Sequence, residues 1–189
     1  VHKTLYVIIA SNRGLCGGFN AQIMKRVRSV LKEDEKQEHS FITIGKKADA
    51  AVRRFGGNVI ASFPDVLVTP RVEHMRPIAT IIVDEFTSAR VDRVVVIYPD
   101  YISVLTQEVK VRALLPVALK DTKKALHEME SSADATSNVP IAPAAAGVSS
   151  HDEYTIEPRT DTVISRMVPR LIEMELYHAV LESNASQES

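Results

Sequence analysis

Short apolar runs alternate with amphipathic stretches through most of the chain. The runs are short enough for strands, and the amphipathic stretches repeat their apolar residues at helical spacing. Strands are predicted at residues 3–10, 41–44, 58–63, 92–98, 102–106, 108–112 and 154–157. Helices are predicted at residues 20–32, 73–89, 121–130 and 160–189, with a further short helix that follows Lys47 and reaches Phe55. Pro99 and Asp100 predict a turn after the strand at 92–98.

The order and composition of these elements indicate the fold class. The strand at 3–10 is apolar at nearly every position, which is typical of a parallel sheet covered on both faces. We therefore expect a single α/β domain over residues 1–189. Its core would be a Rossmann-like, open, mostly parallel sheet of about five strands with helices on both faces. Pro77 is compatible with its helix only in the first turn, so that helix is expected to begin near Met75.

Two segments depart from this pattern. Residues 131–150 are rich in alanine, serine, threonine and proline, which predicts a disordered surface insertion. The helix at 160–189 has apolar residues on more than one face, whereas a helix on a single sheet needs only one stripe. We therefore expect it to meet a second surface. The chain begins with Val1 beside a strand and ends within this helical pattern, so we expect a fragment of a longer chain.

Composition narrows the classes of function. The net charge of −1 gives no overall argument for binding nucleic acid or an anionic membrane. Hydrophobic residues form 45% of the chain and charged residues 25%, as in a folded domain. No apolar run approaches the roughly 20 residues that a membrane-spanning helix needs. The chain has one cysteine, so no disulfide can form within it and a reducing compartment is expected.

The glycine-rich stretch after the first strand is the main candidate for chemistry. Gly14, Gly17 and Gly18 allow a tight turn, and such a loop can also bind phosphate through its backbone N–H groups. The lysine and hydroxyl of a Walker A loop are missing, and the dinucleotide-binding glycine pattern is absent. From the residues alone, a structural turn and a phosphate site both remain open.

Cys16 is the second candidate, because a thiol near a helix N-terminus has a lowered pKa. A hydrolase would also need a histidine base and an orienting carboxylate, and the sequence places neither beside Cys16. A small packed residue is the alternative. The enzymatic alternative for the whole chain is thus a small Rossmann-like nucleotide-binding enzyme or a Cys16 hydrolase that uses the loop from Gly14 to Gly18.

The remaining polar clusters carry weaker signals. No histidines or cysteines stand at the spacing of metal ligands, so no metal site is predicted. Lys46, Lys47, Arg53 and Arg54 could form a basic patch on one short helix, either as a solvated face or as a contact for an acidic protein surface. Nucleic acid is disfavoured because no aromatic residues lie between these charges.

Several motifs resemble one family in a consistent order. Ser11, Asn12, Arg13, Gly14, Leu15, Cys16, Gly17, Gly18, Phe19 and Asn20 resemble the S-D-R-G-L-C-G-G-F-N signature of the gamma subunit of F-type ATP synthase. Later segments resemble further motifs of the same family, namely Gly45–Lys47, Ser103–Glu108, Leu114–Pro116, Tyr154–Pro158 and Leu181–Ser186. The matches extend from the first strand to the last residues.

The resemblance implies a globular foot domain flanked by two long helices that form an antiparallel coiled coil, of which this chain would hold only stubs. It implies a non-catalytic rotor subunit in the central stalk of a proton-translocating synthase. That subunit couples rotation of the membrane ring to ATP synthesis in the catalytic head. Its implied partners are the epsilon subunit, the ring subunits and, through the missing coiled coil, the alpha and beta subunits.

The resemblance also assigns residues and a location. It places Tyr154 and Glu157 near the membrane ring, and it places the start of the coiled coil at Leu181, Glu182, Ser183, Ala185 and Ser186. The glycine-rich signature is then a packed turn, and no cofactor, metal, nucleic acid or small-molecule substrate is expected. The implied location is peripheral, on the cytoplasmic face of a bacterial plasma membrane or the equivalent face of an organelle inner membrane.

Overall fold

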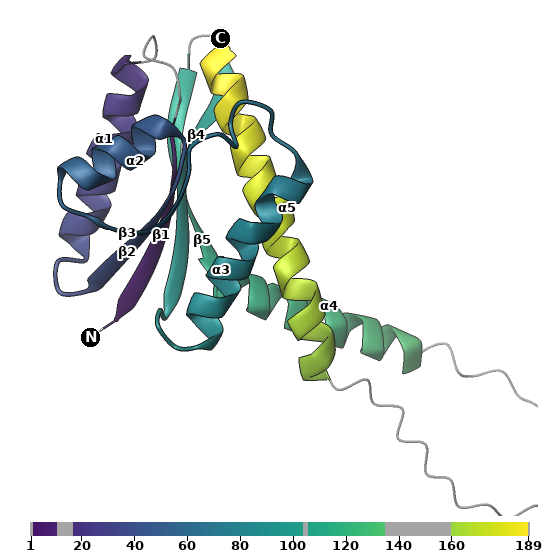
Figure 1. Cartoon of the computed structure of the whole chain (residues 1–189). Coiled ribbons are helices and arrows are strands. Elements are labelled where there is room, and N and C mark those ends of the chain that lie inside the picture. The colour runs from purple at the N-terminus through teal and green to yellow at the C-terminus, as the bar shows by residue number, and fades with distance from the viewer. Residues whose placement is uncertain (1, 11–16, 104–105, 135–159, 189) are drawn as a thin grey trace, which may run out of the picture.

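A computed structural model describes residues 2–10, 17–103, 106–134 and 160–188 (Figure 1). The strands are β1 (Lys3–Ile9), β2 (Glu38–Ile44), β3 (Asn58–Phe63), β4 (Arg93–Ser103) and β5 (Thr106–Leu115). The helices are α1 (Gly17–Glu33), α2 (Lys46–Arg54), α3 (Met75–Thr87), α4 (Val117–Asp134) and α5 (Thr160–Glu188), with a short 3₁₀ turn, η2 (Val72–His74), before α3. The strand–helix alternation predicted from the sequence is confirmed.

The five strands form one sheet in the order β3-β2-β1-β4-β5. The strands β1 to β4 run parallel to one another, and β5 is antiparallel to β4. The expected Rossmann-like, mostly parallel sheet is therefore confirmed. β4 and β5 pair from Val94 with Leu115 to Ser103 with Thr106, which makes a long two-stranded extension at one edge of the sheet.

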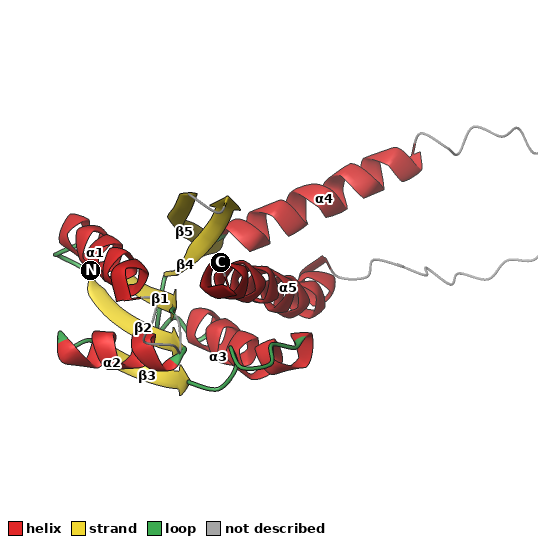
Figure 2. Cartoon of the chain, turned by 90° about the horizontal axis from the view of Figure 1, so that it is seen from above, coloured by secondary structure: helices red, strands yellow, loops and turns green. Residues whose placement is uncertain are grey.

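Helices cover both faces of this sheet, as Figure 2 shows. Successive side chains of β1 point to opposite faces, so Tyr6 and Ile8 pack under α1 and α2 while Val7 and Ile9 pack under α3 and α5. All four of these side chains are fully buried. The apolar character of β1 at every position thus follows from its place in the middle of a covered sheet.

Two prolines show how local context sets the element bounds. Pro77 lies in the first turn of α3, which begins at Met75 as expected. The predicted turn at Pro99 and Asp100 is wrong, because β4 continues through both residues to Ser103. Pro99 is tolerated because β1 pairs with β4 only as far as Ile97, so the missing N–H of Pro99 costs no bond to β1.

The segment between β5 and α5 differs partly from the prediction. The helix expected at 121–130 is longer and covers Val117–Asp134, so the first four residues of the predicted insertion at 131–150 are helical. The rest of that insertion, and the strand expected at 154–157, lie outside the described residues. The helix α4 projects away from the sheet beside α5 (Figures 1 and 2).

Candidate functional site

The glycine-rich signature joins the end of β1 to the start of α1. Residues 11–16 lie outside the described part of the chain, so the structure tests neither a phosphate site at Gly14 nor a nucleophilic Cys16. The helix α1 begins at Gly17, earlier than the expected start at Asn20. The side-chain oxygen of Asn20 is buried and has no hydrogen-bond partner among the described residues.

Gly45 fixes the turn from β2 into α2. Its φ is 100°, a left-handed backbone conformation that residues other than glycine rarely adopt. A Cβ atom on Gly45 would lie 1.9 Å from the carbonyl oxygen of Ala10, and the Gly45 N–H donates to the carbonyl of Phe63 at 3.1 Å. This glycine therefore allows close packing where the carboxyl ends of β1, β2 and β3 meet.

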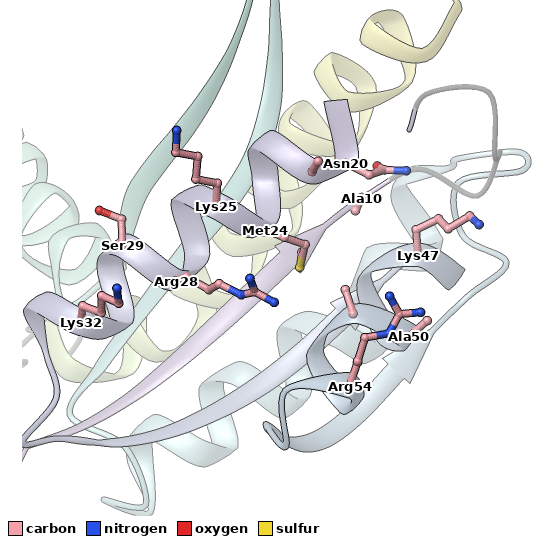
Figure 3. A pocket seen from close by; sticks show the side chains of 12 residues that line it. Ala10, Asn20, Met24, Lys25, Arg28, Ser29, Lys32, Lys47, Ala50 and Arg54 are labelled. Atoms are coloured by element: carbon pink, nitrogen blue, oxygen red, sulfur yellow. The ribbon is translucent and has the colours of Figure 1, made fainter. Parts of the chain in front are cut away.

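A groove of about 730 Å³ lies between α1 and α2. Its floor contains Met24 and small side chains such as Ala21 and Ala50, and Lys25 and Arg28 lie on the α1 side. Figure 3 shows Met24 and Arg28 reaching from α1 toward α2. Small residues on both helices leave the space that larger side chains would fill.

The charged residues of this groove, here named the basic groove, are all cations. They are Lys25, Arg28 and Lys32 on α1 and Lys47 and Arg54 on α2. The residues of the basic patch predicted on the short helix α2 therefore do not all face the same surroundings. Lys47 and Arg54 line the groove, whereas Arg53 is paired with Asp49 at 3.0 Å.

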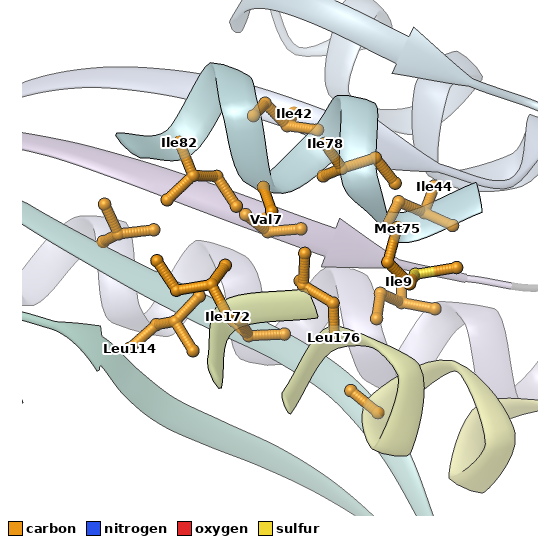
Figure 4. Packing of buried hydrophobic residues seen from close by; sticks show 14 of the residues in the cluster. Val7, Ile9, Ile42, Ile44, Met75, Ile78, Ile82, Leu114, Ile172 and Leu176 are labelled. Atoms are coloured by element: carbon orange, nitrogen blue, oxygen red, sulfur yellow. The ribbon is translucent and has the colours of Figure 1, made fainter. Parts of the chain in front are cut away.

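The inner face of α5 packs deeply against the sheet. Ile172, Leu176 and Val180 are fully buried and join one core with α3 and the sheet (Figure 4). Polar contacts add to this packing at the end of the helix, where the side-chain amide of Asn184 donates to the carbonyl of Leu67 at 3.2 Å. This apolar stripe accounts for one of the apolar faces noted in the sequence.

The opposite side of α5 carries the second apolar stripe. Met167, Met174 and Leu181 are 41%, 55% and 40% exposed, and they recur every seven residues. A repeat of seven places side chains along one line of a helix, as in the contact line of a coiled coil. We call these three residues the outer seam. The described residues leave the seam largely uncovered, so α5 has one occupied and one available apolar face.

The predicted coiled-coil start contains residues of both kinds. Ser183 is fully buried against the domain, whereas Leu181 belongs to the outer seam and Ala185 is exposed. Glu182 forms a hydrogen bond with the side chain of Asp100 on β4. The side chain of Ser186 lies outside the described part of the structure. The motif thus lies near the end of α5, where one face still packs on the domain and the other still exposes apolar residues.

Glu182 belongs to a cluster of charges that joins α5 to the long hairpin. Asp100 on β4 is buried and forms an ion pair with Lys110 on β5. The bond from Lys110 lowers the pKa of Asp100, and the hydrogen bond with Asp100 raises the pKa of Glu182. Glu182 therefore binds its proton more tightly than an isolated glutamate does.

A second polar cluster lies at the other end of the sheet. The hydroxyl of Tyr6 donates to Asp34 at 2.9 Å, and Arg93 approaches the same carboxylate at 3.4 Å. Burial is the main cause that raises the pKa of Tyr6, and the hydrogen bond with Asp34 raises it further. The cluster fixes the end of α1 to the sheet, so we assign it a structural role.

Other kinds of site receive no support from the described residues. No group of His, Cys, Asp or Glu in that part of the chain is placed to hold a metal ion. Within the described residues, no helix is both long and apolar enough to span a membrane. Tyr154 and Glu157 lie outside the described residues, so their predicted contact with a membrane ring stays a prediction.

Solved structures with a similar fold come from ATP synthase rotors. The central stalk and c-ring structure of the Tetrahymena thermophila mitochondrial ATP synthase contains a chain with a TM-score of 0.66 and 21% identity, covering 97% of this chain and 70% of that one. A rotor structure of the Euglena gracilis mitochondrial ATP synthase gives a TM-score of 0.59 at 21% identity, covering 96% and 61%. These likenesses concern the fold.

Sequence comparisons identify the family. The ATP synthase gamma chain of Xanthomonas campestris pv. campestris (strain B100) is 29% identical over 189 residues, which cover 99% of this chain and 58% of that protein. The gamma chain of Chlorobaculum parvum is 29% identical over 194 residues, covering 100% and 59%. This chain thus spans a little over half the length of these relatives. The family described as ATP synthase matches residues 1–189, and the chain therefore belongs to that family, with gamma chains as its relatives.

Proposed function

We propose that this chain is the foot of the rotor in a proton-translocating F-type ATP synthase. In this role it has no active site of its own. It transmits rotation between the membrane ring and the catalytic head and binds the epsilon subunit. It is held at the membrane peripherally, through the complex, on the cytoplasmic face of a bacterial membrane or the equivalent organelle face.

The two apolar faces of α5 are the observation that carries this proposal. Ile172 and Leu176 on the inner face are fully buried against the sheet, so the helix is fixed to the domain. Met174, between them in sequence, is 55% exposed on the outer seam. A helix that is fixed on one side and offers a seven-residue apolar repeat on the other suits a shaft that packs against a second long helix.

The assignments that lie outside the described residues form part of the same proposal. We expect Tyr154 and Glu157 to contact the membrane ring, and we expect residues 11–16 of the signature to act as a packed turn that leads into α1 at Gly17. The alpha and beta subunits would meet only the coiled coil beyond the domain. The start of that coiled coil is proposed at Leu181–Ser186.

Calorimetric titration with the epsilon subunit of the same organism tests the proposal directly. We expect saturable heat when epsilon is added to the chain, and no heat when ATP is the titrant. ATP serves as the control because the enzymatic alternative requires a nucleotide site in the glycine-rich loop. ATP binding without any response to epsilon would contradict the rotor role and support the alternative.

A further inference from the structure

The basic groove between α1 and α2 is a second surface, separate from the outer seam on α5. Lys25, Arg28 and Lys32 recur along α1 over about two turns, a distance of roughly 10 Å at 1.5 Å per residue. Lys47 and Arg54 stand on the facing helix. The cations therefore border the groove along its length and do not gather at one point.

These cations have no counter-ions among the described residues. None of the five forms an ion pair there, and no carboxylate lines the groove. Arg53 provides a contrast, because it is adjacent to Arg54 in sequence and is held by Asp49 at 3.0 Å. Like charges on two facing helices repel one another, so an anion placed between them would be attracted by both walls. The chain as a whole has a net charge of −1, so this positive surface is a local feature.

The shape and floor of the groove favour one kind of anion. Phosphate sites usually gather backbone N–H groups and cations around a single point, whereas these cations are spread over two helical turns. Met24, Ala21 and Ala50 give the groove an apolar floor between its charged borders. None of the residues that line the groove is aromatic, which disfavours single-stranded nucleic acid.

We propose that the basic groove binds an acidic amphipathic segment of a partner protein. The small apolar side chains of that segment would lie on the floor at Met24 and Ala50. Its carboxylates would lie on both flanks, beside Arg28 on one wall and Arg54 on the other. This is the helix-in-groove mode of recognition, with charge complementarity at the rims and apolar contact at the centre. The inference does not depend on the rotor role.

Fluorescence anisotropy with two labelled peptides tests this proposal. The probe is a peptide of about twelve residues, roughly three helical turns, with leucine and alanine along one stripe and glutamate on both flanks. Its control is an isomer of identical composition with the glutamates permuted around the helix. We expect the amphipathic probe to bind the full 189-residue chain about tenfold more tightly than the permuted isomer.

Paired variants locate the site. Arg28→Gln with Arg54→Gln should weaken binding of the probe about tenfold, because two partly desolvated ion pairs are lost. Lys120→Gln with Lys123→Gln is the matched control, because it removes the same charge from exposed positions on α4, away from the groove. We expect it to change the affinity by less than about twofold, since screening weakens distant charges.

A third variant separates shape from charge. Ala50→Trp fills the floor of the groove and leaves the net charge unchanged, and because Ala50 is exposed the fold should tolerate it. Circular dichroism of each variant checks that tolerance. We expect this variant to weaken binding of the amphipathic probe about tenfold as well. Equal binding of both peptides, or equal losses from the groove and α4 pairs, would overturn the proposal. Displacement of the probe by sodium tripolyphosphate at lower concentration than by unlabelled peptide would also overturn it, in favour of a phosphate site.

Discussion

Ile172 and Met174 on α5 allow the two faces of the helix to be tested separately. Ile172 is fully buried in the core shown in Figure 4, whereas Met174 is 55% exposed. Replacing Ile172 by alanine removes three carbons at about 0.8 kcal/mol each and leaves a partly relaxed cavity. We expect the free energy of unfolding to fall by about 3 to 4 kcal/mol. For a chain of this length that lowers the Tm by roughly 10 °C.

The matched variant Met174→Ala should behave differently. An exposed side chain leaves no cavity, so we expect a change of less than about 0.5 kcal/mol in the isolated chain. Urea unfolding followed by circular dichroism measures both variants under the same conditions. In the assembled synthase, Met174→Glu should lower the rate of ATP synthesis, because it would place a charge in the proposed helix–helix contact. Equal destabilisation of the isolated chain by both alanine variants would refute the two-face reasoning.

Three further perturbations address the turn, the Tyr6 cluster and the charges on α5. Gly45→Ala should abolish stable folding, because the added Cβ would overlap a backbone oxygen. Gly56 has a φ of 80° with open space around it, so Gly56→Ala should lower the free energy of unfolding by only about 1 kcal/mol. Thermal unfolding distinguishes the two variants. Tyr6→Phe should lower the free energy of unfolding by about 1 kcal/mol through loss of one buried hydrogen bond, measured in urea. The raised pKa of Glu182 gives a contribution to stability that is complete below the unfolded pKa and is lost as pH rises through the folded pKa. The lowered pKa of Asp100 gives the opposite contribution, lost as pH falls through its folded pKa, so stability should be greatest in weak acid. Glu182→Gln should remove the loss of stability on the alkaline side. A pH series of urea unfolding curves in which that loss persists would count against the raised pKa of Glu182.

Features set by local sequence were predicted closely. The strand β3 has the predicted bounds, and α3 begins at Met75 because Pro77 permits only a first-turn position. The extension of β4 through Pro99 was not predicted. It depends on where β1 stops pairing with β4, which is a property of the tertiary structure and not of the local sequence. The length of α4 was missed for a similar reason, since the polar composition after residue 130 masks the helical continuation to Asp134.

The candidate sites divide in the same way. Periodicity alone indicated two apolar faces on the last helix, and the structure separates them into the buried stripe at Ile172 and the outer seam at Met174. The basic groove was only half visible in the sequence. Lys47 and Arg54 were noted on one short helix, but their alignment with Arg28 on α1 depends on how two helices pack on the same face of the sheet. The pairing of Asp100 with Glu182 joins two residues far apart in the sequence and has no local signal.

The polar contacts of α5 bear on how the proposed rotor foot would transmit torque. Apolar packing at the inner face resists both separation from the sheet and rotation about the helix axis, because turning α5 would expose Ile172 and Leu176. Ion pairs are directional, and Glu173 reaches Arg76 on α3 at 3.7 Å while Glu175 reaches Arg112 on β5 at 3.0 Å. These two carboxylates leave the helix about 200° apart at 3.6 residues per turn, so they hold α5 from opposite sides. Each pair is weak alone because its arginine is largely exposed. Together with the bond from Glu182 to β4 near the end of the helix, they oppose rotation of α5 in either direction. A shaft extending from α5 would then turn with the domain and not within it.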